Sequence, residues 1–414
     1  MPARTCAPLF LLAFVLAPAG VIAQGAPPPP APAAAAGPAA ESGVEGTEAE
    51  APPREVTATK LRIGDIADMG FHVRLQPRLD YGDLVVSQDG KTYDREQDLY
   101  LRRVRFTVTG SALGQLHYVL TLAGDRVGQK NRPNAVTVTD AAVEWRAAEW
   151  FAMRVGRAKL PITRSGFTSS ARQLLVDRPL SVDAARGLFD DVNQPNLLLR
   201  SRLLGGAVAL YAAVADGWNG TGPYSSSPGK TVRTSHPAVV ARVELSPPGL
   251  TEAHKSDSHL GEGKHLTVGA DAGLQEQIQY GDATGKEDRR LVGVDLSSHV
   301  GPLTLQGEAR WWEIRSVGST RGTVKPYGVY GQAGYYIAPI GLEPVARYEL
   351  YVEDSTKSGA RQTVLTVGLN AYLHRHSAKL QLAWVHRAFE AHATGVLPGQ
   401  DAADVAQAQV QLYL

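Results

Sequence analysis

The chain has 414 residues, and its 42 lysines and arginines nearly balance its 41 aspartates and glutamates, which gives a formal net charge of +1. Length alone leaves the number of domains open, because a large β-barrel of this size is a single domain. The single cysteine, Cys6, lies in the first residues of the chain. The rest of the chain therefore has neither thiol redox chemistry nor a thiolate metal site, and no nucleic-acid partner is expected.

The N-terminus has the three parts of an export signal. Arg4 supplies a positive charge, Leu9–Leu16 an apolar core, and Val21-Ile22-Ala23 a small-residue cleavage pattern. We expect residues 1–23 to be a signal peptide that is cleaved on export. An uncleaved membrane anchor is the alternative, but the apolar run is shorter than the roughly 20 residues that a spanning helix needs.

Residues 24–60 are rich in proline and alanine, with scattered glutamates. Such a composition cannot bury a core, so we expect a disordered linker; a binding role for the proline run is the alternative. Nothing after the signal offers about 18 consecutive apolar residues for a transmembrane helix. A membrane β-strand is still allowed, because it needs only about 9–11 residues of alternating character.

Runs of alternating apolar and polar residues, separated by turn residues, repeat from Met69 to the C-terminus. The last run shows the pattern clearly. Its two faces are Ala406, Ala408, Val410, Leu412 and Leu414 on one side, and Gln407, Gln409, Gln411 and Tyr413 on the other. A side-chain period of two without a helical period predicts an all-β fold.

Two all-β folds fit this pattern, a soluble sandwich and an antiparallel transmembrane β-barrel. The apolar faces continue over residues 61–414 with no helix to cover them, which favours a barrel whose outer face meets lipid. We expect about 16 strands in the outer membrane of a Gram-negative bacterium, enclosing an aqueous channel. Long links between strands, such as Pro247–Gly263, are expected on the outside of the cell.

A basic stretch from Trp150 to Pro179 interrupts the alternation. Its cations face a single acid, Asp177, and they are Arg154, Arg157, Lys159, Arg164, Arg172 and Arg178. In a chain of nearly balanced charge, this local excess indicates either an anionic partner or an acidic wall in contact with the stretch.

Several short motifs resemble the phosphate-selective porin O and P family. They are Leu101–Phe106, Val138–Val143, Gly156–Pro161, Thr168–Ser170 and Asp177–Pro179. The resemblance covers about residues 70–414. It implies a trimeric outer-membrane barrel of sixteen strands, with an inward-folded constriction loop after the fifth strand. It also implies a pore lined by arginines and lysines that attracts phosphate-like anions.

Alternation predicts which basic residues face the lumen. Val104, Phe106 and Val108 define the lipid side of one strand, so Arg103 and Arg105 face inward. Arg102 has the opposite phase, and we expect it near the strand end, reaching toward the membrane interface. The same counting puts three more arginines inside, two of them beside glutamates, which predicts a wall of paired charges in the second half of the barrel; they are Arg154, Arg310 and Arg347.

These observations give a hypothesis for the site and an alternative. The predicted anion path is formed by Arg103, Arg105 and Arg154 on the wall, and by Arg157, Lys159, Arg164 and Arg172 on the loop. Guanidinium groups match oxyanion geometry, and weak binding at several sites lets an ion leave again. In the alternative, these residues pair with nearby acids and merely pin the loop, the acids being Asp140, Glu144, Asp177, Asp183, Asp190 and Asp191.

The predicted function is therefore a porin for passive diffusion of phosphate, polyphosphate-like ions, chloride and other small anions, with membrane lipid around it and a homotrimer as its assembly. A general non-selective porin, a barrel enzyme and a structural anchor are the alternatives. The sequence has no nucleophile elbow, phosphate-binding loop or His-Glu-x-x-His motif, so no enzyme, cofactor or metal is expected. His254, His259 and His265, with Asp257 and Glu262, suggest a metal cluster, but a solvated link explains them more simply.

Overall fold

The computed structural model describes residues 59–64, 66–88, 91–130, 134–189, 193–218, 232–252, 254–281, 285–317, 322–391, 393 and 400–414. The predicted signal peptide 1–23 and nearly all of the predicted linker 24–60 lie outside the described residues. The first described element, strand β1, spans Thr59–Ile63 and pairs with the next strand. The described structure thus begins just before the predicted barrel boundary at residue 61.

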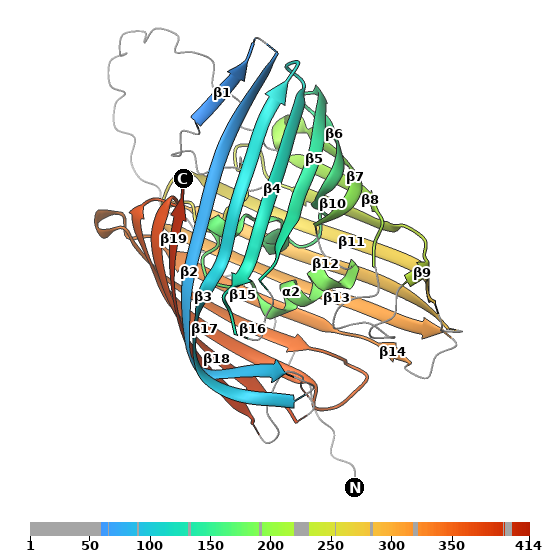
Figure 1. Ribbon diagram of the computed structural model, residues 1–414, viewed down its shortest axis with the longest axis vertical. Helices are drawn as coiled ribbons and strands as arrows, with labels where there is room; N and C mark the ends of the chain where they lie inside the picture. The colour runs from blue at the N-terminus through green and yellow to red at the C-terminus, as the bar shows by residue number, and fades with distance from the viewer. Residues whose placement is uncertain are drawn as a thin grey trace, which may run out of the picture. The chain divides into compact units, whose positions relative to one another are not determined.

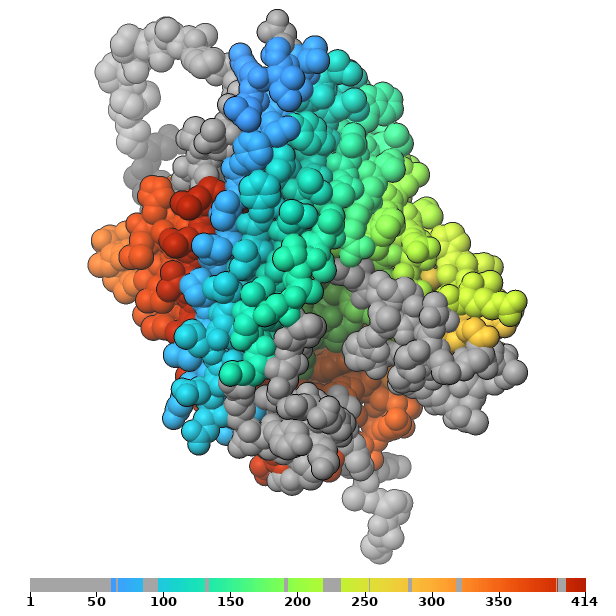
Figure 2. All heavy atoms as spheres, viewed as in Figure 1, coloured from blue at the N-terminus to red at the C-terminus, as the bar shows by residue number. Residues whose placement is uncertain are grey.

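Sixteen antiparallel strands form a closed barrel. They are β2 (Ala67–Gln88), β3 (Lys91–Ala112), β4 (Leu116–Val127), β5 (Val136–Ala148), β6 (Phe151–Lys159), β7 (Asn193–Leu203), β8 (Val208–Ala215), β10 (Ala238–Leu245), β11 (Lys264–Tyr280), β12 (Lys286–Val300), β13 (Leu303–Val317), β15 (Tyr327–Tyr335), β16 (Leu342–Val352), β17 (Arg361–His374), β18 (Ala378–Phe389) and β19 (Ala402–Tyr413). The last strand, β19, pairs with β2 and so closes the barrel. Figures 1 and 2 show the red β19 beside the blue β2. Short strands β9 (Val232–Thr234) and β14 (Thr323–Val324) extend the rim. The predicted all-β barrel is confirmed.

The strands bury polar side chains and expose apolar ones, the reverse of a water-soluble protein. In β19, Val410 and Leu412 are 40% and 42% exposed, whereas Gln409 and Gln411 are 1% and 0% exposed. Large apolar side chains are exposed in the same way along the other strands. An apolar outer surface around a polar interior is stable only where lipid surrounds the barrel.

A loop between β6 and β7 folds into this barrel and is called here the constriction loop, residues 160–189. It contains α1 (Arg164–Phe167), η1 (Ser170–Arg172), α2 (Leu180–Arg186) and η2 (Gly187–Phe189). Its apolar side chains pack on inward residues of the wall, as Phe167 does edge-on against Tyr211. No helix in the described part of the chain is long and apolar enough to cross a membrane. The predicted inward-folded loop is confirmed (Figure 1).

Glycines on the inner face of β15 make room for the constriction loop. A Cβ added to Gly328 would lie 2.2 Å from Cβ of Ser181, and one added to Gly334 would lie 2.8 Å from a methyl group of Leu174. Real Cβ contacts are not this short. A side chain at position 328 would push Ser181 and its backbone away, and one at position 334 would force the end of the Leu174 side chain to move. The packing of the loop against the wall therefore depends on glycine, which has no side chain, at these two positions.

The link from β10 to β11, residues 246–263, is also inside the barrel, which corrects the expectation that this long link faces outward. It lies at the end with the short turns: Gly301 N donates to Gly263 O at 3.3 Å, and Arg375 pairs with Glu262 at 2.6 Å. The link is long because it returns into the lumen, where it contacts the constriction loop. Loop length alone could not separate an inward segment from an outer one.

Candidate functional site

The lumen carries a concentration of cations on the neighbouring strands β2 and β3. Alternation turns Arg74 and Arg78 of β2 inward, together with Arg103 and Arg105 of β3. Arg74 lies directly opposite Arg105 in the register of the two strands. Like charges placed opposite each other destabilise a sheet unless negative groups compensate them. Asp125 does so for Arg105, and Asp80 and Asp177 do so for Arg78.

The two predicted β3 residues face inward, as their alternation indicated. Arg103 is 2% exposed and donates from Nη1 to Oε1 of Gln76 at 2.9 Å. Arg105 donates from Nη2 to both carboxylate oxygens of Asp125, at 3.0 and 3.1 Å. A neutral amide therefore accepts from Arg103, and a half-exposed carboxylate accepts from Arg105.

Arg102 contradicts its prediction, because its side chain points toward the lumen. It is the extra residue of a β-bulge, since Gln76 pairs with Arg103 while Pro77 pairs with Leu101. A bulge shifts the side-chain phase, so two consecutive arginines turn to the same side. Arg102 Nε lies 3.4 Å from Asp177 Oδ1 on the constriction loop.

The predicted residues of β6 form a second group. Arg154 is 2% exposed and donates from Nη2 to the backbone carbonyl of Lys159 at 2.7 Å. Arg157 is half-buried, and Lys159, the last residue of the strand, is 7% exposed. Arg154 and Lys159 thus lie on the buried side of the strand, where the wall passes into the constriction loop. Arg157 pairs in register with Ala141 and Pro195, which are both exposed, so it has the outward phase of β6.

The predicted loop residues Arg164 and Arg172 lie where the two inward segments meet. Arg164 donates from both terminal nitrogens to Glu252, each at 2.7 Å, and the backbone carbonyl of Arg172 accepts from Asp257 N at 3.1 Å. Burial alone would raise the pKa of Glu252, but the Arg164 guanidinium holds that pKa well below its usual range. Arg164 is thus part of a buried ion pair that joins the segments.

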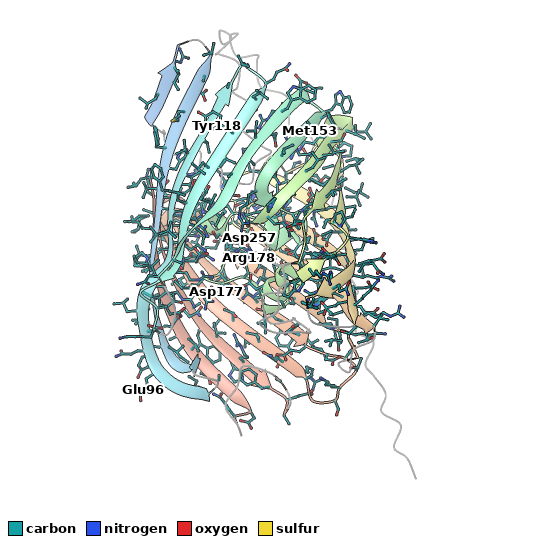
Figure 3. The ribbon with its side chains drawn as sticks, turned by 45° about the vertical axis from the view of Figure 1, so that its right-hand side comes forward. Glu96, Tyr118, Met153, Asp177, Arg178 and Asp257 are labelled. Carbon is teal, nitrogen blue, oxygen red and sulfur yellow. The ribbon has the colours of Figure 1, made fainter. Side chains whose placement is uncertain are left out.

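Asp177 of the constriction loop binds the basic wall. Its Oδ2 lies 2.7 Å from Arg78 Nη1, and its backbone carbonyl accepts from Arg347 Nη1 at 2.9 Å. Burial would raise the pKa of Asp177, but Arg78 and Arg102 hold it well below its usual range. Figure 3 labels Asp177 and Arg178 of the constriction loop and Asp257 of the other inward segment, all between the walls of the barrel.

The other acids of the pairing hypothesis have different partners. Glu144 pairs with Arg146 at 2.9 Å and with Arg200 at 3.1 Å, and Asp183 pairs with Arg186. Asp140 accepts from Asn193 Nδ2 at 3.0 Å. Asp190 and Asp191 lie outside the described residues. Of the acids named from sequence that the structure describes, Asp177 is therefore the one whose ion pairs, with Arg78 and Arg102, join the loop to the basic wall.

Sequence reasoning missed three lumen cations that the structure brings to the site. Arg74 and Arg78 alternate with Val73, Leu75 and Leu79, a pattern that could have revealed them. Lys379 is 0% exposed on β18 and donates to the backbone carbonyl of Gln173 at 3.1 Å, although the two residues are far apart in sequence. Alternation along β18 could have predicted that Lys379 faces inward. Nothing in the sequence could have predicted that it contacts Gln173 of the constriction loop.

The opposite wall carries paired charges, as the sequence predicted for Arg310 and Arg347. Arg310 contacts Asp271 at 2.7 Å and also Glu308, while Arg347 contacts Glu349 at 2.7 Å. Arg242 joins the first network through Asp271. Both walls of the lumen thus carry paired charges. On β2 and β3 the arginines are closely spaced, and Arg78 and Arg105 pair with Asp80 and Asp125.

A closed sixteen-stranded barrel with an apolar exterior, a charged interior and a loop folded into its lumen is an outer-membrane porin. The comparisons agree with this class. The family model described as phosphate-selective porin O and P matches residues 71–414, and the chain belongs to that family.

Two solved structures share the fold at low identity, and one further protein is similar in sequence. An anion-selective porin from Comamonas acidovorans matches with a TM-score of 0.57 and 12% identity, covering 84% of this chain and 100% of that one. The outer membrane channel DcaP of Acinetobacter baumannii matches with a TM-score of 0.57 and 13% identity, covering 86% and 99%. An uncharacterized protein from Aquifex aeolicus (strain VF5) is 29% identical over 335 residues, covering 74% of this chain and 79% of that protein.

Proposed function

We propose that this porin conducts small anions in preference to cations, by passive diffusion through a water-filled lumen. The observation that carries the proposal is the set of inward arginines on β2 and β3, with Arg74 directly opposite Arg105 and Arg103 next to them. Such a wall raises the local concentration of anions and lowers that of cations. Phosphate, polyphosphate-like ions and chloride are the proposed permeant species, and the family description supports phosphate.

Six of the seven residues predicted from sequence divide into two roles under this proposal. Arg103 and Arg105 belong to the wall of the anion path, and Arg154 and Lys159 continue it along β6. Arg157 has the outward phase of that strand and is not assigned to the path. Arg164 and Arg172 hold the inward segments together, because one pairs with Glu252 and the other accepts from Asp257 through its backbone. The anion-path hypothesis thus applies to the wall, and the pinning hypothesis applies to the loop.

Charge selectivity tests the role of the wall. The double substitution Arg103→Gln and Arg105→Gln removes two inward charges and keeps hydrogen-bonding groups. The ratio of chloride to potassium permeability, measured from the zero-current potential in planar bilayers, is expected to fall several-fold. Arg290→Gln is the matched control, because Arg290 is 58% exposed and pairs with Glu276. Equal permeability ratios in the double variant and the control would contradict the proposal that Arg103 and Arg105 cause the anion preference.

A general non-selective porin is the second candidate, because the wall of Arg242, Asp271, Asp295 and Arg310 offers both signs of charge. Competition by phosphate separates a phosphate-preferring channel from a general one. If phosphate binds in the lumen, millimolar phosphate reduces the single-channel chloride current. A chloride current that is unchanged by phosphate would favour the general porin.

Export and assembly complete the proposal. We infer that residues 1–23 are cleaved on export, that residues 24–60 link the mature N-terminus to the barrel, and that three copies form a homotrimer. A fold neighbour, OmpT of Vibrio cholerae, is described in a trimer form, with a TM-score of 0.53 and 10% identity, covering 84% of this chain and 100% of that one. The N-terminal sequence and the mass in detergent of the purified protein test the three statements.

A further inference from the structure

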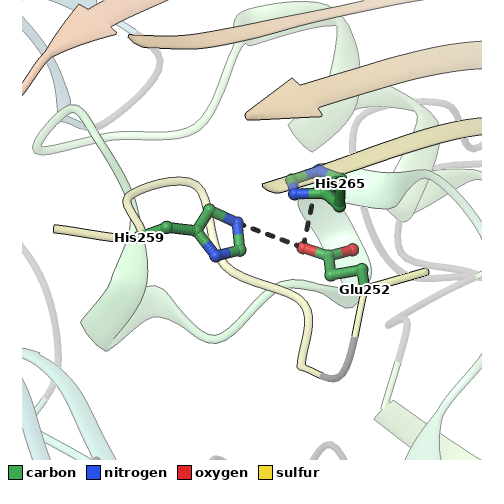
Figure 4. A group of neighbouring side chains, drawn as sticks. All are labelled: Glu252, His259 and His265. Carbon is green, nitrogen blue, oxygen red and sulfur yellow. Dashed lines mark ion pairs between the residues drawn. The ribbon is translucent and has the colours of Figure 1, made fainter. Parts of the chain in front are cut away.

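The second inward segment places three side chains that bind transition metals around one point. Glu252 and His259 belong to the 246–263 link, and His265 is the second residue of β11. One ligand atom from each residue lies within 4.8 Å of the others (Figure 4). We propose that Glu252, His259 and His265 bind a divalent transition-metal ion, with Zn²⁺ as the reference ion.

The distances fit a tetrahedral ion with little rearrangement. His259 Nε2 lies 3.4 Å from Glu252 Oε1, and His265 Nε2 lies 3.9 Å from the same oxygen. Neighbouring ligand atoms of a tetrahedral zinc ion with bonds of about 2.1 Å are ~3.4 Å apart. Rotation of the side chains would bring the three atoms to bonding distance, with the metal replacing the contact of His265 Nε2 with Ser297 Oγ at 2.9 Å. Imidazole and carboxylate together are ligands that zinc accepts.

The surroundings hold these ligands in position. Arg164 binds both oxygens of Glu252 at 2.7 Å, and Ser256 N donates to Oε1 at 3.1 Å, so the carboxylate is fixed toward the histidines. Hydrogen bonds of this kind orient metal ligands in known sites. The positive charge of Arg164 lowers the affinity for a cation, so the expected binding is weaker than with an unpaired carboxylate.

Access and neighbouring groups also fit a bound ion. A cavity of about 340 Å³ is lined by the three proposed ligands and by His299. The His299 ring stacks on the His259 ring at 4.4 Å, and its Nε2 lies 2.7 Å from the backbone carbonyl of Glu262. With the proton on Nε2, Nδ1 of His299 has a lone pair, and this buried atom has no hydrogen-bond partner. A third imidazole is thus available beside the Glu252, His259 and His265 side chains.

The three proposed ligands lie close together in the sequence, in the 246–263 link and at the start of β11. A bound ion would fasten the link to the start of β11, at the end of the barrel with the short turns. The solvated link that the sequence favoured for these histidines holds only in part. Glu262 is exposed and His259 is half-buried, whereas Asp257 and His265 are buried.

Metal titration of the folded, tag-free porin in detergent tests the proposal. One Co²⁺ per chain is expected, with the strong visible absorption of a four-coordinate ion, and Zn²⁺ is expected to displace it in calorimetry. His259→Ala and His265→Ala are each expected to weaken binding about tenfold or more. If His259→Ala fails to fold by circular dichroism, His259→Gln provides the same test with a polar side chain of similar size.

His386→Ala is the matched control. His386 Nδ1 lies 3.0 Å from Asp404 Oδ1, so the two residues form a histidine–carboxylate pair. Neither residue belongs to the proposed metal site. Its removal is expected to leave the titration unchanged. Equal loss of binding in His386→Ala and His259→Ala, or a wild-type titration no stronger than that of His259→Ala, would overturn the site. Because the readout is binding, failure of anion selectivity would not affect the result.

Discussion

The Arg164–Glu252 pair shows how one buried contact joins two distant segments of the chain. Both side chains are nearly fully buried, at 1% and 5% exposed, and both oxygens of the carboxylate are bonded. Removing one partner of such a pair leaves an uncompensated charge, which costs about 3–5 kcal/mol. Glu252→Gln is therefore expected to lower the free energy of unfolding by this amount, as measured by denaturant titration.

Glu390→Gln is the matched control for this change. Glu390 pairs with Arg361, and the two side chains are 37% and 54% exposed. Exposed pairs of this kind contribute about 0–1 kcal/mol. A loss of stability in Glu252→Gln that is no larger than in Glu390→Gln would show that the buried pair does not hold the segments together.

The same pair gives a pH dependence with a definite sign. The folded state holds the pKa of Glu252 well below 4.5, the ordinary value for glutamate. Its contribution is therefore complete above about pH 4.5 and is lost as pH falls through the folded pKa. The stability difference between wild type and Glu252→Gln is expected to persist at pH 5 and to shrink in more acidic solution. A difference that disappears between pH 7 and pH 5 would contradict the depressed pKa.

For single residues, the sequence predicted which way a side chain faces better than it predicted which residue that side chain contacts. Period-two alternation correctly turned Arg103, Arg105 and Arg154 inward, because the apolar residues between them must face lipid. It failed at Arg102, where a β-bulge shifts the phase. It could not predict that Arg164 pairs with Glu252, because that contact depends on where two loops meet inside the barrel.

The constriction loop depends on strands that leave space for it. Gly328 and Gly334 lie on the inner face of β15, and added side chains there would meet Ser181 and Leu174. Gly328→Ala is therefore expected to displace the loop, with an overpacking cost of about 1–3 kcal/mol. Single-channel recordings are expected to show a changed conductance with more current noise. Gly331→Ala in the same strand is the control, because nothing lies within 4 Å of its added Cβ. Identical recordings for the two variants would contradict this role.

The two inward segments show which elements sequence patterns can and cannot predict. The constriction loop was predicted because its basic residues break the alternation after a strand, and because its motifs resemble a porin family. The 246–263 link was placed on the wrong side, since its polar composition suits solvent as well as a charged lumen. Its buried partners, such as Glu343 for Ser258, come from distant strands.

In the whole barrel, charge is distributed unevenly around the lumen. One side has networks of paired residues such as Arg242 with Asp295, whereas β2 and β3 bring Arg74, Arg103 and Arg105 together. The sequence showed a net charge close to zero and could not show this separation, because it arises only when the sheet closes. An almost neutral chain can thus form a lumen in which arginines are concentrated on one pair of strands.

The zero-current potential of the wild-type porin tests anion preference most directly. The measurement uses a planar bilayer with potassium chloride at different concentrations on its two sides. We predict a potential whose sign shows chloride to be more permeant than potassium, and whose size falls in the Arg103→Gln, Arg105→Gln variant. A potential of the opposite sign, which shows potassium to be more permeant, would contradict the anion path.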